Sequence, residues 1–372
     1  MNHFSAHPSL IRGCICTIMF LGLAFGMFVS GAAAAKQTFR GETGTTRVNG
    51  WVEVGPGPGL LTRALLTSFA PRRRAGQKRA AAVAAKVTPT PDALVFSDRN
   101  WIYYLAANSS VPRKLAKGSF PTLSPDRKRV AYCLPQNSDV SAPAAATVML
   151  FDLSTGKTTT VLRANAWIAH LRWSPNGERI SLTQAFSSGK RELDTVGPDG
   201  TRIQKLIAGG EQGADDIFNP VWAPDGQSIY FQDMSNLFQV STSGKVMAQT
   251  PLRAITEKQE AVTSSDSFVP SPADPNVLAY TRSVPGTRLF EKTFGEPNTA
   301  LFLYDIRTKS HQRLTSPDVL ALDPVWSRDG RFIYFTGYHD RDGRAAYPFK
   351  IYRIAVDGTG LTQITSGEMP DS

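Results

Sequence analysis

The chain contains few of the residues that proteins use to cross-link themselves or to hold metal ions. Of its 372 residues, three are cysteines and five are histidines. Cys14 and Cys16 lie near the amino terminus, so a chain processed after them would keep Cys133 alone. One thiol forms neither an internal disulfide nor a cysteine-based metal site. Because Cys133 lies in an apolar segment, we predict that it is buried.

The sequence motifs of common hydrolases, metalloproteases and nucleotide-binding proteins are also missing. Neither G-x-S-x-G, H-E-x-x-H nor G-x-x-x-x-G-K-[ST] occurs. After residue 35, histidine is found only at positions 170, 311 and 339. Asp340, Asp342 and Gly343 beside His339 match only a fragment of a calcium loop, because no bidentate glutamate follows. The sequence therefore predicts no catalytic residue, no metal and no cofactor.

A long apolar run occurs only near the amino terminus. Arg12 is followed by an uncharged apolar stretch at residues 14–29 and by small residues up to position 35. This order predicts a secretory signal peptide over residues 1–35. An uncleaved membrane anchor is the alternative, because the 22 residues at 14–35 carry no charge. We therefore expect a periplasmic or secreted protein, with an anchored form as the alternative.

Positive charge is concentrated in the next segment. Residues 36–90 are rich in Gly, Pro and Ala and contain ten Lys or Arg against two Glu, in a chain whose net charge is +10. With Arg12 also set aside, residues 91–372 have a net charge of only +1. Nucleic-acid-binding domains carry their cations on a folded face, so we predict no nucleic-acid partner. Residues 36–90 are expected to form a flexible basic linker that can touch acidic lipid headgroups.

A short sequence motif of the Ser-Pro-Asp-Gly type recurs along the remaining chain. In Ser174-Pro175-Asn176-Gly177, each residue matches the preference of its position in a type I turn. An apolar run rich in β-branched or aromatic residues follows each copy, as at residues 229–231, which predicts a β-hairpin. The five copies start at Ser124, Ser174, Ala223, Ser271 and Ser327, at intervals of 50, 49, 48 and 56 residues.

A second hairpin follows in every repeat. Its turns are expected near residues 154–157, 198–200, 242–244, 305–309 and 357–358. Two hairpins in each repeat make one four-stranded antiparallel sheet, and several such sheets around an axis make a β-propeller. A β-solenoid is the alternative, although its repeats are usually much shorter.

The repeat resembles that of the TolB-like propellers. A pattern close to W-S-P-D-G-x-x-I-x-F, followed later by a strand, a D-G or T-G turn and L-T, occurs at residues 222–231 and 326–335 and twice more in weaker form. The resemblance covers residues 94–372. It extends to the non-catalytic propellers of prolyl-oligopeptidase-type enzymes, so it implies a fold more specifically than a role.

The five copies account for five blades, and the two ends of the chain are expected to supply the sixth. Residues 94–96, 101–105 and 111–115 are predicted strands without a Trp-Ser-Pro strand before them. We therefore predict an all-β fold: a six-bladed β-propeller over residues 91–372, with four-stranded antiparallel blades and one blade split between the termini. Residues 369–372 would add the missing strand, or residues 48–54 would supply it instead.

The register of the repeats also selects candidate ligand-binding residues. Equivalent positions on the inner strands of a propeller fall on a ring around its axis, and a polar ring would suit a ligand site. The alternative is that these residues cap the strands and bind ordered water. Three residues before the tryptophan position stand Phe120 and the four polar candidates His170, Asn219, Ser267 and Asp323.

Tryptophan recurs at one repeat position, which predicts packing between blades. The three equivalent residues are Trp173, Trp222 and Trp326. Trp51, Trp101 and Trp167 lie outside this register, and of these we expect Trp167 to be the most exposed.

Together these features predict an exported, non-enzymatic, monomeric scaffold that binds a protein or peptide partner in the cell envelope, with a glycan as another partner class. TolB has an N-terminal α/β domain and acts in the Tol-Pal system, whereas residues 36–90 are too short and too biased in composition for such a domain. The resemblance thus implies the propeller and the periplasmic location more than the whole Tol-Pal role. The alternative function is a propeller-type polysaccharide lyase or a peptidase-associated propeller, with a ligand or metal site at the central channel.

Overall fold

The structure, a computed structural model, describes residues 87–135, 145–256, 262–284, 299–342 and 349–372. Within these residues, twenty-four strands form six four-stranded antiparallel sheets, and no helix is long and apolar enough to cross a membrane. The prediction of an all-β six-bladed propeller is therefore confirmed. The two short 3-10 helices are η2 (Leu252–Ala254) and η3 (Asp340–Asp342).

The six sheets are the blades, numbered here from the amino-terminal side. Blade 1 contains β24 (Glu368–Asp371), β1 (Leu94–Asp98), β2 (Trp101–Leu105) and β3 (Arg113–Lys117). Blade 2 contains β4 (Ser119–Leu123), β5 (Arg129–Pro135), β6 (Ala146–Asp152) and β7 (Thr158–Ala164). Blade 3 contains β8 (Trp167–Trp173), β9 (Ile180–Ala185), β10 (Arg191–Val196) and β11 (Gln204–Ala208).

The other three blades repeat this order. Blade 4 contains β12 (Phe218–Trp222), β13 (Ser228–Gln232), β14 (Asn236–Ser241) and β15 (Val246–Pro251). Blade 5 contains β16 (Phe268–Pro270), β17 (Val277–Ser283), β18 (Thr299–Asp305) and β19 (Ser310–Arg313). Blade 6 contains β20 (Val319–Trp326), β21 (Phe332–His339), β22 (Lys350–Ala355) and β23 (Thr362–Ser366).

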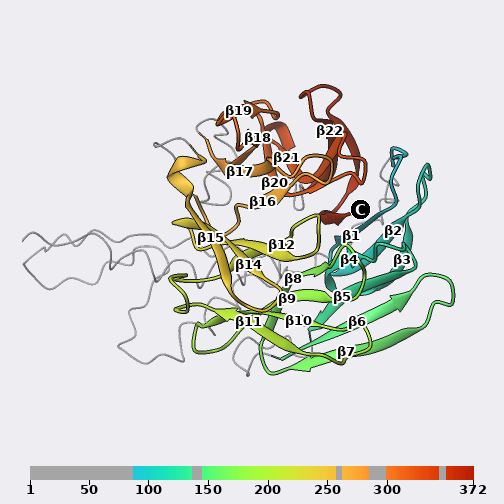
Figure 1. Cartoon of the computed structure of the whole chain (residues 1–372). Coiled ribbons are helices and arrows are strands. Elements are labelled where there is room, and N and C mark those ends of the chain that lie inside the picture. Colours follow the sequence, from blue (N-terminus) through green and yellow to red (C-terminus); the bar gives the residue numbers. More distant parts are fainter. Residues whose placement is uncertain (1–86, 136–144, 257–261, 285–298, 343–348) are drawn as a thin grey trace, which may run out of the picture. The chain divides into compact units, whose positions relative to one another are not determined.

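The split blade is confirmed, and the carboxyl-terminal residues close it. In blade 1, β24 pairs antiparallel with β1, with Val95 opposite Asp371 and Ser97 opposite Glu368. Figure 1 shows the carboxyl terminus beside β1. The alternative closing segment, residues 48–54, lies outside the described residues. Thr88, before the first strand, already contacts the propeller, because its N–H donates to the carbonyl of Ile364 (2.8 Å).

The first strands of the blades surround the axis. These inner strands, β24, β4, β8, β12, β16 and β20, each contact the next one around the ring. Because all six sheets have the same strand order, the inner strands all begin at one end of the propeller, which we call the upper end. They stop at the lower end, where the Ser-Pro-Asp-Gly turns lie.

Each of these turns is held by its own serine and acidic or amide residue. The Gly177 N–H donates to the Ser174 carbonyl (2.9 Å), which closes the turn. The Arg179 N–H donates to Ser174 Oγ (2.9 Å), and the Glu178 N–H donates to Asn176 Oδ1 (3.1 Å). The same bonds recur around Ser327, where the N–H groups of Phe332 and Arg331 donate to Ser327 Oγ (2.8 Å) and Asp329 Oδ1 (3.0 Å).

The turns of neighbouring blades also touch one another. Gly177 and Gly226 have φ values of +73° and +69°, and a Cβ on them would lie 3.8 Å from Pro125 and 3.5 Å from Pro175, in the turn of the preceding blade. At Gly330 the approach is closer, since a Cβ would lie 2.6 Å from the Cβ of Ala273. The glycine of the Ser-Pro-Asp-Gly motif therefore has two roles: it adopts the φ that the turn requires, and it allows the turn of the preceding blade to approach.

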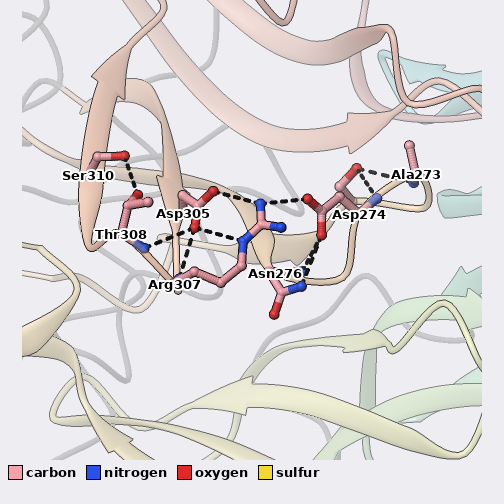
Figure 2. A network of polar contacts seen from close by, with 8 residues as sticks. Ala273, Asp274, Asn276, Asp305, Arg307, Thr308 and Ser310 are labelled. Carbon is pink, nitrogen blue, oxygen red and sulfur yellow. Dashed lines mark hydrogen bonds and ion pairs between the residues drawn. The ribbon is translucent and has the colours of Figure 1, made fainter.

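Blade 5 departs from the Ser-Pro-Asp-Gly motif and has a different polar network at its lower end. Figure 2 shows Arg307 between two carboxylates, one from each turn of this blade. Its Nη2 donates to Asp274 Oδ2 and Asp305 Oδ2, both at 2.8 Å. Asp274 Oδ1 accepts from the backbone N–H of Asn276 (3.0 Å). The network joins the Ser271–Asp274 turn to the turn that begins at Asp305.

The apolar core lies within and between the blades. Trp173, Trp222 and Trp326 are buried, which confirms their predicted role in packing. The indole N–H groups of Trp222 and Trp326 donate to carbonyls of the preceding inner strand, at Arg172 (3.2 Å) and Val269 (2.9 Å). The predicted burial of Cys133 is confirmed, and burial raises the pKa of its thiol to about 12.

Candidate ligand site on the propeller axis

Five of the six inner strands carry a non-glycine residue at positive φ. Such residues are uncommon and often mark functional sites, because the strain must be offset by the rest of the structure. The position is that of the predicted ring, and it adds Met369 of β24 as a member that the sequence did not reveal. The φ values are +52° at Phe120, +53° at His170, +49° at Asn219, +48° at Asp323 and +52° at Met369.

In four of the five strands, the next residue explains why the strand is distorted at this position. It is proline in four cases, at positions 121, 220, 324 and 370, and leucine at 171. Proline has no N–H to donate to a ladder, and the pairing register of each inner strand shifts at this point. Blade 5 lacks the feature: Ser267 is not followed by proline, and its N–H donates to Thr281 Oγ1 (3.2 Å).

The side chains of the ring reach towards neighbouring blades. Asn219 Nδ2 donates to the carbonyls of Ser264 (2.9 Å) and Asp266 (2.8 Å), above blade 5. The rings of Phe120 and His170, from blades 2 and 3, lie 5.8 Å apart between their centroids. The side-chain amide of Asn219 therefore forms a contact between blades, while the imidazole of His170 lies against an aromatic ring.

Asp323 takes part in a similar contact between blades 6 and 1. Thr336 Oγ1 donates to Asp323 Oδ2 (2.9 Å) and accepts from the Met369 N–H (2.8 Å). Burial raises the pKa of Asp323, and the positive charge of Arg172 opposes the rise. Asp323 as a whole residue is only partly buried.

Arg172 is the residue that the ring prediction missed. It lies on β8, one residue before Trp173, and its Nη1 donates to the carbonyl of Leu171 (3.1 Å). Burial, with the charges of Arg172 and Arg191, lowers the pKa of His170 to about 3, so His170 is neutral at pH 7. The sequence signal was available: at this repeat position the other blades have Thr122, Val221, Val269, Val325 and Asp371.

Asp371, at the same repeat position in blade 1, is the second acidic residue near Arg172. Its Oδ2 accepts from Thr122 Oγ1 and from the Leu123 N–H, both at 2.8 Å. Burial raises the pKa of Asp371, and the charge of Arg172 again opposes this. One cation thus acts on carboxylates from two other blades, so the arrangement depends on closure of the ring.

The other candidates from the sequence lie away from the axis. His339 Nε2 pairs with Asp318 Oδ2 (3.0 Å), and Asp342 pairs with Lys350 Nζ; Gly343 lies outside the described residues. Across the described part of the chain, no three His, Cys, Asp or Glu side chains are grouped as metal ligands. The guanidinium groups near His170 would also repel a bound cation.

Comparison with known proteins supports this description of the fold. Among solved structures, TolB from Acinetobacter baumannii superposes with a TM-score of 0.54 at 18% identity, over 77% of this chain and 65% of that one. The putative TolB from Agrobacterium tumefaciens gives 0.50 at 14% identity, over 77% of this chain and 91% of that one. This chain has the TolB-like propeller fold.

The remaining comparisons place limits on what this TolB-like propeller shares with its relatives. No family model matches the chain. It is 23% identical over 234 residues to the uncharacterized peptidase YuxL of Bacillus subtilis strain 168, a match that covers 62% of this chain. The chain spans 31% of the length of that curated relative and 65% of the Acinetobacter TolB chain.

Proposed function

We propose that this protein is an exported, non-enzymatic TolB-like propeller that binds a protein or peptide partner at the upper end of its axis. The observation that carries the proposal is the ring of strained residues on the inner strands. Strain of this kind costs of the order of 1–3 kcal/mol for each residue. Five repeats keep it, and three of the five residues, Phe120, Asn219 and Met369, are second in their strands, at the upper end.

The lengths of the connections between strands also favour the upper end as the binding end. At the lower end, connections are short, such as residues 242–245 between β14 and β15 and residues 197–203 between β10 and β11. At the upper end the described connections include the single Gly118 between β3 and β4 and the nine residues 209–217 between β11 and β12. Rigid scaffolds carry recognition on long, variable loops, so we assign partner binding to the upper end.

The proposed location and assembly follow from the sequence. A signal peptide over residues 1–35 would export the chain to the periplasm or beyond, and residues 36–90 would tether the propeller and contact acidic lipid. We propose that the protein acts as a monomer, because blade closure by β24 leaves no inner strand unpaired.

Site-specific photo-crosslinking in cells tests the proposal. A photoreactive amino acid is placed at the exposed upper positions Ser188 and Asp215 and, as matched controls, at the exposed lower positions Ser243 and Thr155. We expect discrete protein adducts from the upper positions only. Adducts that form equally at the lower positions, or at none of the four, would contradict the proposal.

The enzyme alternative is supported by one comparison, the peptidase name of the B. subtilis relative. It requires either a catalytic centre or a metal. The test is metal analysis of the purified protein beside its His170→Ala variant. A stoichiometric ion that is lost in the variant would favour a lyase-like metal site on the axis over a scaffold.

A further inference from the structure

The outer hairpin of blade 1 carries positive charge and no acidic residue. Residues 99–117, which contain β2, β3 and their connection, include Arg99, Arg113, Lys114 and Lys117 and neither Asp nor Glu. Residues 91–372 together have a net charge of only +1, so the rest of the propeller is net negative. The net positive charge of the propeller therefore belongs to this hairpin.

Three of these cations lie beside aromatic rings. Lys114 Nζ and Lys117 Nζ lie 3.3 and 5.5 Å from the centroid of the Trp101 ring, and Arg113 Cζ lies 5.7 Å from the centroid of the Tyr104 ring. The three cations are exposed, whereas the two aromatic residues are half-buried. We call these five residues the basic edge of blade 1.

The cations of the basic edge keep their charge unpaired within the described part of the chain. Arg113 Nη2 donates to the carbonyl of Leu153 (3.0 Å), which orients the guanidinium without neutralising it. Among the described residues, no carboxylate is paired with Arg113, Lys114 or Lys117. Their charge is therefore available to a negatively charged partner.

The basic edge lies on the outermost strand of its blade. In blade 1, β3 pairs with β2 on one side only, and Figure 1 shows it beyond β2 as seen from β1 and the carboxyl terminus. The connection before β3 contains Val111, whose side chain is an exposed apolar group (74%). Cations, Trp and Tyr rings and an exposed aliphatic side chain together are typical of surfaces that lie in the headgroup region of a bilayer.

The basic segment of the sequence joins the propeller at this same hairpin. The ten Lys or Arg residues of the predicted linker all lie at or before Lys86. Four residues later, the carbonyl of Thr90 accepts from the N–H of Asn108 (2.7 Å), which lies in the connection between β2 and β3. The predicted linker and the basic edge therefore offer positive charge from neighbouring parts of the chain.

We propose that the basic edge of blade 1 docks on a lipid bilayer that contains anionic headgroups. Arg113, Lys114 and Lys117 contact the acidic headgroups, while Val111 and the ring of Trp101 contact the boundary between headgroups and acyl chains. We favour lipid over an acidic protein because the apolar run at residues 14–29 and the basic linker precede this hairpin in the sequence.

This inference goes beyond the proposed function, which places lipid contact in residues 36–90 alone. Because β3 is the outermost strand, docking along it leaves the upper end of the axis open to a protein partner. The two proposals can fail separately, since photo-crosslinking detects protein partners in cells, whereas docking needs only the purified chain and lipid.

Lipid quenching at single positions tests where the propeller contacts a bilayer. A fluorescent amino acid is placed in the full chain at Val111 or, as a control, at Ile203, an exposed apolar position (57%) in blade 3. The vesicles contain phosphatidylcholine with brominated acyl chains, with or without phosphatidylglycerol. We expect quenching at position 111 only, and only with phosphatidylglycerol, because binding of the linker alone brings neither position into the bilayer.

Charge variants of the chain labelled at position 111 assign the contact. The measure is the ratio of quenched to unquenched chains at a lipid concentration that binds all of the protein. We expect the double change Lys114→Gln and Lys117→Gln to lower this ratio about tenfold or more, since each Lys beside an anionic surface contributes roughly fivefold. The matched control, Lys245→Gln with Lys309→Gln, removes two exposed lysines from blades 4 and 5 and should dock like the wild type.

Thermal unfolding without vesicles shows whether each double variant folds, and Arg113→Gln replaces the first pair if it does not. Vesicle-bound protein without quenching at position 111 would overturn the proposal, as would equal quenching at positions 111 and 203. A folded Lys114→Gln and Lys117→Gln variant that is quenched like the wild type would overturn it too. If polyglutamate but not lipid changes the fluorescence at position 111, the basic edge binds an acidic protein instead.

Discussion

At the scale of single residues, His170 shows how the axis influences stability. Burial, together with the positive charges of Arg172 and Arg191, lowers its pKa to about 3. In the unfolded chain, histidine has a pKa near 6.5. As the pH falls from about 6.5 towards 3, the unfolded chain gains a proton that the folded protein does not. The contribution of His170 to stability is therefore full above this window and is lost on acidification.

We expect His170→Gln to make the protein less sensitive to acid. Denaturant unfolding of the wild type and the variant at pH 7.0 and 4.5 measures the effect. The wild type should lose more free energy of unfolding between the two pH values, by up to about 1.4 kcal/mol for each pH unit below 6.5. If both proteins lose the same free energy of unfolding, folding does not lower the pKa of His170.

Asp266 has the opposite dependence on pH. Burial raises its pKa to about 7, although the N–H and hydroxyl of Thr263 donate to its Oδ2 (2.7 and 3.0 Å). The unfolded chain releases this proton near pH 3.9, so between about pH 4 and 7 the folded state holds more protons and its stability falls as the pH rises.

We expect Asp266→Asn to be more stable than the wild type at pH 8, by up to about 4 kcal/mol, because asparagine carries no charge and can still accept from Thr263. At pH 4 the two proteins should differ little. The measurement is the free energy of unfolding at both pH values. A variant that is less stable at pH 8 would mean that the carboxylate is stabilised by its surroundings.

At the scale of elements, the recurrent turn couples local conformation to blade packing. Gly156 and Gly330 have nearly equal φ values, +72° and +70°, and both lie in lower-end turns. A Cβ on Gly156 would meet nothing within 4 Å, whereas one on Gly330 would lie 2.6 Å from Ala273 Cβ. The pair therefore separates the cost of the backbone conformation from the cost of the contact between blades.

We expect Gly156→Ala to cost about 1 kcal/mol of unfolding free energy, the usual cost of an L side chain in the left-handed region. Gly330→Ala should cost roughly 1–3 kcal/mol more, because the turns of blades 5 and 6 must move apart. Denaturant titration of both variants measures the difference. If both variants lose the same free energy of unfolding, the turn of blade 5 moves aside without a measurable energetic cost.

The local chemistry of this turn explains how much the sequence could predict. Ser, Pro, Asp and Gly determine the turn by bonds within a few residues, so the inner hairpins and the six blades could be predicted from it. Met369-Pro370-Asp371-Ser372 has no tryptophan and no turn after it, so its place in the ring of strained residues was not recognised. The proximity of Arg172 to Asp323 and Asp371 could not be predicted, because it exists only when distant blades meet at the axis.

At the scale of the whole molecule, the ring is closed by a few residues at the carboxyl end. Asp371 accepts two hydrogen bonds from blade 2, and Ser372 Oγ donates to the carbonyl of Trp326 in blade 6 (2.7 Å). The last residues thus connect three blades, and without them β1 loses its inner partner.

We expect a chain that stops at Gly367 to lose about 3 kcal/mol or more of unfolding free energy, because the bonds of Thr122 and Leu123 to a buried carboxylate are removed together. A chain that lacks only Ser372 is the control and should lose about 1 kcal/mol, the value of one hydrogen bond. A synthetic peptide of residues 365–372 should restore stability to the shorter chain in proportion to its concentration. If truncation at Gly367 leaves the unfolding curve unchanged, another segment must close blade 1 in solution, and residues 48–54 would be the first to delete.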